Sequence, residues 1–298
     1  MSEPQPLPGQ VPALAVIIPH YNDLARLRTN LTALAPQLLA RPEVEAVVVD
    51  NNSPLDLAPL AADFPAVRFV IEPEKGAAAA RNRGVGETRA PQLAFLDSDC
   101  VPAPGWLDTA IRLASGDALI GGRVDTFDET PPPKSGAEAF ETAFAFHQKT
   151  YVEKKGFSVT ANLLAGRRVF EVAGPMVVGM AEDVDWCRAA TAKGFPLSYA
   201  DELAVSHPTR QDWAALRRKW RRTTDEMFRS NGTGAAARAR WALRALAVAG
   251  SAVLHSPKVL NAPRLSPLEK LRGLAMLWRL RLTRAGWMLA QAATGGGA

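Results

Sequence analysis

Cysteine is nearly absent from this 298-residue sequence, because Cys100 and Cys187 are the only two and neither lies in a CxxC spacing. This scarcity argues against a fold held by disulfides or by cysteine-bound metal, and we expect a reduced, cytoplasmic protein. Long apolar runs are also lacking: no uncharged apolar run reaches the ~18–20 residues that a membrane-spanning helix needs. Residues 1–12 carry four prolines and no basic start followed by an apolar run. We therefore expect a disordered leader there and no signal peptide.

Acidic residues are scarce in the last third of the chain. Residues 207–298 hold 17 Lys and Arg against 4 Asp and Glu, whereas residues 1–206 hold 18 against 26. This shift in charge predicts two parts with different partners. We expect one folded domain over residues 13–210 and a basic, amphipathic helical region over residues 211–298.

Short apolar runs alternate with helical stretches in the first hundred residues. The runs at 14–18, 44–49, 67–71 and 93–96 are typical of parallel strands buried on both faces. Helices are expected over 22–39, from residue 76 and over 182–193, with a further strand near 197–206. This order predicts an α/β fold with a doubly wound, mostly parallel sheet.

Polar residues follow three of these strands, at 20–22, 50–53 and 97–99. The carboxyl ends of parallel strands meet at one edge, where open α/β sheets bind ligands. Turn-forming residues would explain one such cluster, but three at one edge favour a binding site. Asp97 and Asp99 flank Ser98, and such closely spaced carboxylates suit a hard divalent cation that also binds substrate phosphates. The alternative for this motif alone is a solvated acidic turn.

Taken together and in this order, the motifs resemble those of the family 2 inverting glycosyltransferases, which have the GT-A fold. The matching segments are residues 16–22, 47–53, 75–84, 94–100, 162–164, 167–170 and 181–185. The resemblance spans about residues 13 to 208. It implies an enzyme that transfers a sugar from a nucleotide-diphosphate donor to an acceptor hydroxyl, with Mn²⁺ or Mg²⁺ as its cofactor.

The resemblance assigns the nucleotide site residue by residue. Its members here are Pro19, Tyr21, Asn22, Asp50, Arg81, Asp97 and Ser98. Tyr21 corresponds to the residue that lies against the base, with Pro19 shaping the turn. Asp50 corresponds to the carboxylate that reads the base edge and favours a uracil-type N–H, hence a UDP-sugar. Arg81 corresponds to a cation on the nucleotide side, with a solvated helix residue as the alternative.

The same resemblance assigns the metal ligands and the base. Asp99 corresponds to the direct metal ligand and His207 to a second ligand, with a structural histidine as the alternative. Asp183 corresponds to the general base that deprotonates the acceptor as it attacks. Glu182 is expected on the acceptor side or, like Asp183 in the alternative, as an acid in the first turn of a helix.

Two family motifs are missing, and they bear on the substrate. The Gly-Gly-Phe-Asp segment is replaced at residues 173–178, so the sugar is not identified. The QxxRW motif of processive synthases is absent, which favours single additions. The expected acceptor is a glycan or a lipid-linked sugar.

The basic C-terminal region is open to more than one interpretation. Arginine and tryptophan on amphipathic helices predict binding to an anionic membrane surface, at the inner face of the membrane. The alternative is a helical subdomain packed on the core. A nucleic-acid binder is disfavoured because the basic charge is confined to this region, and a nucleotidyltransferase because residues 20–23 are no glycine-rich basic loop. A catalytically inactive relative that serves as a scaffold stays open.

Overall fold

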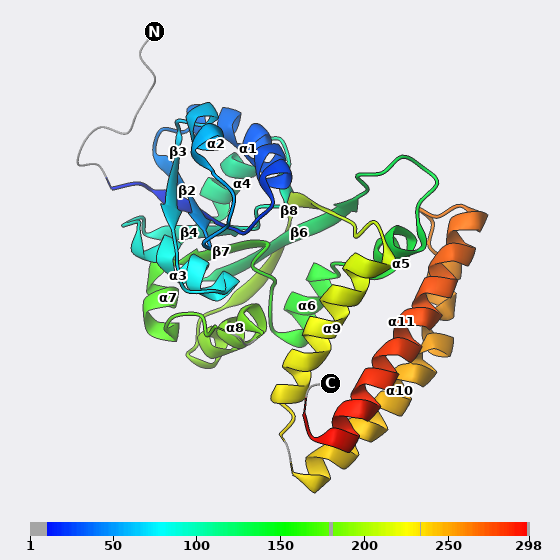
Figure 1. Cartoon of the computed structure of the whole chain (residues 1–298). Helices are drawn as coiled ribbons and strands as arrows, with labels where there is room; N and C mark the ends of the chain where they lie inside the picture. The colour runs from blue at the N-terminus through cyan, green and yellow to red at the C-terminus, as the bar shows by residue number, and fades with distance from the viewer. Residues whose placement is uncertain (1–10, 179–180, 233, 297–298) are drawn as a thin grey trace. The chain divides into compact units, whose positions relative to one another are not determined.

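We describe the protein from a computed structural model, in which residues 11–178, 181–232 and 234–296 are described (Figure 1). The chain forms two compact units. The first holds the chain up to Asp125 and residues 146–207, and the second holds residues 126–145 and the chain from Pro208 onward. Residues 126–145 thus belong with the C-terminal helices, which no feature of the sequence indicates. The boundary predicted after residue 210 stays a prediction, and residues 1–10 of the predicted leader lie outside the described residues.

The described residues form a sheet of eight strands in the order β3-β2-β1-β4-β7-β6-β8-β5. The strands are β1 (Leu14–His20), β2 (Val44–Asp50), β3 (Val67–Ile71), β4 (Gln92–Leu96), β5 (Val101–Pro102), β6 (Leu119–Phe127), β7 (Asn162–Gly166) and β8 (Leu197–Pro208). Strands β1 to β4 pair in parallel. Strand β7 is antiparallel to β4 and β6, and β5 is antiparallel to β8.

The four apolar runs of the sequence form the four parallel strands, and the α/β class is confirmed. The sequence does not predict β5, β6 or β7. Strand β6 has two adjacent glycines and mixes buried with partly exposed residues, and β7 has only three apolar residues in a row. Such strands lack the continuous apolar run that marks a strand buried on both faces.

Helices cover both faces of the sheet, as the doubly wound arrangement requires. The helices of the first unit are α1 (Leu24–Leu39), α2 (Ala58–Asp63), α3 (Ala77–Gly86), α4 (Trp106–Leu113), α6 (Gln148–Lys155), α7 (Arg167–Ala173) and α8 (Glu182–Ala192). Alternate residues of β1 point to opposite faces. Val16 and Ile18 belong to a core that α1 and α4 complete, whereas Ile17 belongs to a second core that includes Trp186 of α8.

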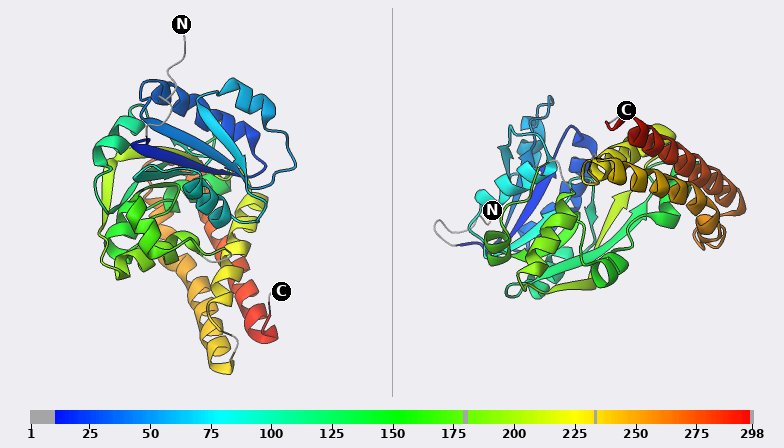
Figure 2. Two further views of the ribbon diagram at one scale, coloured as in Figure 1. Left: turned by 90° about the vertical axis from the view of Figure 1, so that its left-hand side faces the viewer. Right: turned by 90° about the horizontal axis from the view of Figure 1, so that it is seen from below.

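The second unit is helical. It contains α5 (Gly136–Phe144), α9 (Trp213–Arg229), α10 (Ala235–Leu260) and α11 (Pro267–Thr294). Helices α10 and α11 run side by side and antiparallel, because Trp241 of α10 contacts Gln291 whereas Val259 contacts Gly273 (Figures 1 and 2). Among the helices formed by the described residues, none combines the length and the apolar character that a membrane crossing requires.

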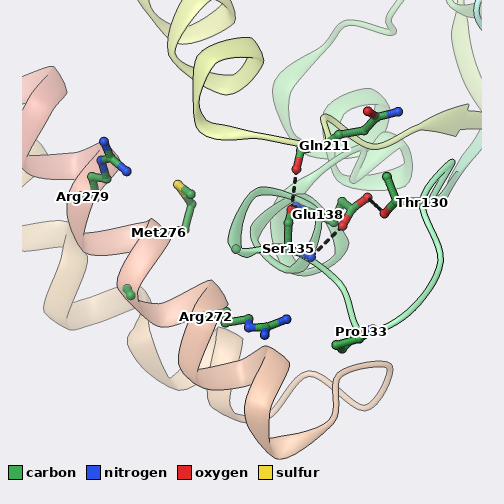
Figure 3. Close-up of a pocket in the computed structure, with 10 residues that line it drawn as sticks. Thr130, Pro133, Ser135, Glu138, Gln211, Arg272, Met276 and Arg279 are labelled. Atoms are coloured by element: carbon green, nitrogen blue, oxygen red, sulfur yellow. Dashed lines mark hydrogen bonds between the residues drawn. The ribbon is translucent and has the colours of Figure 1, made fainter.

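A pocket of about 600 Å³ lies within the second unit, between the start of α5 and α11 (Figure 3). Its buried acidic group, Glu138, is already bonded within the unit. Glu138 accepts hydrogen bonds from Thr130 and from the backbone of Ser135, and the Ser135 hydroxyl donates to the carbonyl of Gln211. Ser135 and Glu138 form the capping box of α5, so these two lining residues have a structural role.

Candidate active site

The turns that follow β1 and β2 are bonded to each other. Asn22 and Asn52 have left-handed backbones, with φ of 54° and 58°, a conformation that asparagine tolerates better than most residues. The backbone N–H of Asn22 donates to Ser53 Oγ at 2.8 Å, and that hydroxyl donates to Asp50 Oδ1 at 2.5 Å. The two strand ends therefore form one polar unit.

Asp50 is held by His20 as well. His20 Nε2 accepts from the backbone N–H of Asp23 at 3.1 Å, so Nδ1 carries the proton and donates to Asp50 Oδ1 at 3.0 Å. The backbone N–H of Ser53 donates to the other carboxylate oxygen at 3.0 Å. The carboxylate thus accepts three bonds, which leaves about one of its roughly four lone-pair sites free. Its side chain is only 9% exposed, and this free site is what remains for a ligand.

Tyr21 and Pro19 lie beside this network. Tyr21 is 58% exposed, so its ring is not part of the core and offers a free face. Pro19 pairs with Val49 of β2, while the pairing of β1 with β4 ends at Ile17. Proline lacks a backbone N–H, and this position beyond the end of the β4 ladder leaves no partner group unsatisfied.

Asn51 fixes the loop that leads into α3, a role that the sequence does not reveal. Its side chain accepts from the backbone N–H of Gly76 at 2.7 Å and donates to the carbonyls of Glu72 and Glu74. Gly76 has φ of 135°, a conformation that favours glycine. Helix α3 begins directly after it and carries Arg81.

The Asp97–Asp99 turn follows β4 and is held from α1 by Asn30. This fully buried side chain donates to the carbonyls of Asp97 at 3.1 Å and of Cys100 at 2.7 Å. No motif in the sequence includes Asn30, although a signal exists, since it is a polar residue on the apolar face formed by Leu27, Leu31 and Leu34. Its bonds fix the backbone that presents both carboxylates, with Ser98 between them.

Arg81 joins two acidic groups. Its guanidinium donates to Asp97 Oδ1 at 2.6 Å and to Glu182 Oε1 at 3.1 Å. The residue is 4% exposed, which is incompatible with the alternative of a solvated helix residue. Burial acts to lower the pKa of Arg81, but the charges of Asp97, Glu182 and Asp183 outweigh it, and the pKa is raised. Arg81 therefore stays charged.

Asp99, in the turn between β4 and β5, lies beside His207 of β8. Strand β5 pairs Val101 with Ser206 of β8, which brings His207 beside the Asp97–Asp99 turn. His207 Nε2 lies 3.2 Å from Asp99 Oδ2, and the ring of Phe146 packs against the imidazole at 4.7 Å between centroids. His207 is 7% exposed, so its position is fixed by packing.

The Asp99–His207 pair fits a divalent cation. Two adjacent ligands of an octahedral site, each about 2.1 Å from the metal, lie about 3.0 Å apart. The observed 3.2 Å between Asp99 Oδ2 and His207 Nε2 is close to this value. In the part of the chain that the structure describes, no group of three or more Asp, Glu, His or Cys residues could hold a metal. Further ligands would have to come from a substrate or from water.

Asp183 lies in the first turn of α8, next to Glu182. Burial and the charge of Glu182 raise its pKa from the ordinary 3.8 to about 6, although Arg81 acts in the opposite direction. Its Oδ1 accepts from the backbone N–H of Val184 at 2.9 Å. The N-cap residue is Ala181, which makes no side-chain cap bond. Glu182 bonds to Arg81, and its side chain is 25% exposed.

Most of the site residues predicted from the sequence thus belong to three groups joined by hydrogen bonds or ion pairs. Asn22 and Asp50 share one network at the ends of β1 and β2. Asp97, Arg81 and Glu182 form a second chain that ends beside Asp183, and Asp99 with His207 forms a third group. All of them belong to the first unit.

The raised pKa of Asp183 predicts how the free energy of unfolding depends on pH. Its folded pKa of about 6 lies above 3.8, so ionised Asp183 disfavours the folded state. The free-energy cost of ionising Asp183 in the folded state is absent below pH 3.8, the unfolded pKa. It grows between pH 3.8 and about pH 6 and is constant at higher pH. We expect Asp183→Asn to raise the free energy of unfolding at pH 8 by about 1–3 kcal/mol, and less at pH 4.5. Thermal melts at both pH values measure this.

The matched control is Asp185→Asn, two residues further along α8 and exposed. We expect this variant to melt with the wild type at both pH values. An Asp183→Asn gain that is equal at pH 8 and pH 4.5, or a loss of stability at pH 8, would contradict the burial of a charged carboxylate.

Comparison with known proteins identifies the family. The family model described as glycosyl transferase family 2 matches residues 15–173, from β1 to α7. The chain is 31% identical over 221 residues to the glycosyltransferase AglE of Haloferax volcanii, which covers 71% of this chain and 72% of AglE.

Solved structures agree with this match. The mannosyltransferase PcManGT from Pyrobaculum calidifontis, in complex with GDP-Man and Mn²⁺, aligns with a TM-score of 0.54 and 18% identity over 98% of this chain and 78% of its own. Glucosyl-3-phosphoglycerate synthase from Mycobacterium tuberculosis, with Mn²⁺ and UDP-glucose, aligns with a TM-score of 0.51 and 15% identity over 74% of this chain and 77% of its own. These likenesses confirm the expected GT-A fold. The chain belongs to glycosyl transferase family 2 and is a glycosyltransferase.

Proposed function

We propose that this glycosyltransferase moves a sugar from a nucleotide diphosphate to an acceptor hydroxyl with inversion, in one metal-assisted displacement. Catalysis is assigned to residues 13–210. The observation that carries the proposal is the chain Asp97–Arg81–Glu182. One buried guanidinium links the acidic turn after β4 to the first turn of α8, where Asp183 lies. Arg81 thereby lies between Asp97, on the proposed donor side, and Glu182, on the proposed acceptor side.

The donor is proposed to be a UDP-sugar. The exposed ring of Tyr21 offers an apolar face for the base, with Pro19 and Asn22 shaping the turn that presents it. Asp50 keeps about one acceptor site free, and a uracil ring offers one imide N–H. The solved neighbours bind GDP-Man and UDP-Glc, so the fold accepts both kinds of base. Asp50 favours the uracil base.

Asp99 and His207 would hold a divalent cation, with Asp97 and Ser98 lining the same turn. Both neighbours described above were solved with Mn²⁺, and imidazole suits Mn²⁺ better than Mg²⁺. When bound, the cation neutralises charge on the departing diphosphate.

Asp183 is the proposed general base. It takes the proton of the acceptor hydroxyl while that oxygen bonds to the anomeric carbon, and the bond from that carbon to the phosphate oxygen breaks. Attack from the face opposite the diphosphate inverts the anomeric centre. A pKa of about 6 keeps Asp183 ionised at neutral pH yet basic enough to accept the proton. Arg81 and Glu182 hold the first turn of α8 in place.

The proposed acceptor is a glycan or a lipid-linked sugar, reached at the inner face of a membrane. The support is the charge of residues 207–298, with 17 Lys and Arg against 4 Asp and Glu. Each basic residue near an anionic leaflet adds about 1 kcal/mol to the attraction. We propose no nucleic-acid partner.

Nucleotide binding tests the donor site before the sugar is known. Thermal melts are run with UDP, GDP and dTDP, each with and without Mn²⁺. A nucleotide at 100 times its Kd stabilises the folded state by about 2.7 kcal/mol, which gives a clear rise in Tm. We expect UDP to raise Tm only with Mn²⁺, and Asp99→Ala to abolish the rise.

Asp63→Ala serves as the acidic control, because Asp63 forms an exposed ion pair with Arg28 on the same unit. This variant should keep the full metal-dependent rise. A chain that no diphosphate stabilises with or without metal would count against the donor site, and the scaffold alternative would then replace the proposal.

The pH dependence of the rate tests the base. With the donor that the melts select, kcat/KM should fall about tenfold per pH unit below pH 6, because protonated Asp183 cannot accept the acceptor proton. Asp183→Asn should lower kcat by about 10²–10⁴ and remove this pH limb, whereas Asp185→Asn should leave both unchanged. NMR of the first-formed product should show inversion.

Nucleotide-induced stabilisation measured at each pH separates the base from the metal site. If stabilisation disappears in parallel with the rate below pH 6, the lost group belongs to the donor site. Retention of the configuration, or an unchanged pH limb in Asp183→Asn, would rule out Asp183 as the base.

A further inference from the structure

Ten large apolar side chains are exposed on α10 and α11. They are Leu243, Leu246, Val253, Leu254 and Leu260 on α10, and Leu268, Leu271, Trp278, Leu282 and Leu289 on α11, each between 40% and 78% exposed. Contiguous exposed apolar surface of this kind marks an interaction site on a folded protein.

The exposed side chains form one stripe on each helix. On α10, Leu246, Val253 and Leu260 follow one another at intervals of seven residues. On α11, Leu271 and Trp278 repeat with the same interval, and Leu282 follows four residues later. Intervals of three, four and seven residues keep side chains on one side of an α-helix.

The two stripes join into a single face that points away from α5 and α9. Trp278 Nε1 donates to Ser256 Oγ at 3.2 Å, and Ser256 lies about one turn from Val253 and Leu260 on α10. Other sides of the two helices make the contacts with α5 and α9. Arg284 stacks on Trp220 of α9 at 4.2 Å, and Trp241 packs against Phe228 of α9. We call the ten exposed side chains the hairpin face.

The charge of the two helices favours an anionic partner for this face. Helix α10 carries Arg238, Arg240, Arg244 and Lys258 without any acid, and α11 carries Lys270, Arg272, Arg279, Arg281 and Arg284 with one acid, Glu269. Glu269 is buried and bonded in its own capping box with Ser266. A second copy of this basic hairpin would be repelled, whereas an anionic lipid surface is attracted.

We propose that the hairpin face binds flat on an anionic lipid surface, with its leucines and Trp278 at the boundary of headgroups and acyl chains. An exposed arginine of the same helices, Arg240, then reaches the phosphates, because long side chains extend toward polar groups while their stems stay on apolar surface. The inference deepens the membrane association proposed above and depends on that proposal. It is independent of the donor site.

The test uses the full chain, purified without detergent, and sedimentation with vesicles at low salt. Vesicles of equal phosphatidylglycerol and phosphatidylcholine should carry down the protein, and 1 M salt should weaken binding because it screens the arginines. A variant with Leu246→Gln, Leu254→Gln, Leu271→Gln and Leu282→Gln should bind at least ten times more weakly. The control carries Leu39→Gln and Val172→Gln, at exposed positions of the first unit, and should bind like the wild type.

The proposal is overturned if the wild type stays in the supernatant, or if the four-residue variant binds vesicles as well as the wild type does. Light scattering in lipid-free buffer tests whether a second copy of the chain covers the hairpin face instead. A wild-type dimer that the four-residue variant converts to a monomer, with vesicle binding unchanged, would assign the face to a second copy. Nucleotide-induced stabilisation on the same samples shows that the variants are folded, and its absence from the wild type would count against the donor site only.

Discussion

The buried ion pairs of Arg81 are the interaction on which the candidate site depends. A guanidinium that is 4% exposed cannot stay charged without partners, and Asp97 and Glu182 supply them at 2.6 and 3.1 Å. Removing either partner would destabilise the folded state, because the buried guanidinium would be left with only one of its two carboxylates. The geometry of the turn after β4 and of the first turn of α8 is therefore tied to one side chain of α3. Stability and the arrangement of the proposed catalytic groups share the same contacts.

The same cation limits how far burial changes Asp183. Burial and Glu182 raise the pKa of Asp183 to about 6, and Arg81 keeps the rise from going further. A carboxylate in this range is ionised at neutral pH but held in an unfavourable state, as a proposed base requires. The packing of the sheet and its two cores offsets the cost of ionised Asp183 and holds the site residues in place.

The sequence predicts some parts of this site much better than others. Strands β1 to β4 are predictable because each is a continuous apolar run, and the polar residues after them mark the ligand edge. Asp97 and Asp99 are candidates because they are closely spaced carboxylates after a strand, whereas Asp183 is a candidate only through the resemblance to one family. Asn30 and Asn51 are missed because each acts through bonds to distant backbone, over separations that no local pattern encodes. The pairing of His207 with Asp99 depends on β5, a two-residue strand that the sequence does not predict.

We propose that Asp99 and His207 bind the cation and that a nucleotide diphosphate completes its set of ligands. The most direct measurement is an anomalous difference map at the manganese absorption edge, from crystals grown with UDP and Mn²⁺. We predict one peak within bonding distance of both Asp99 Oδ2 and His207 Nε2, and no such peak in Asp99→Ala crystals with the same ligands. A manganese peak bound to other side chains, or density for UDP with no metal beside Asp99, would contradict this account of the site.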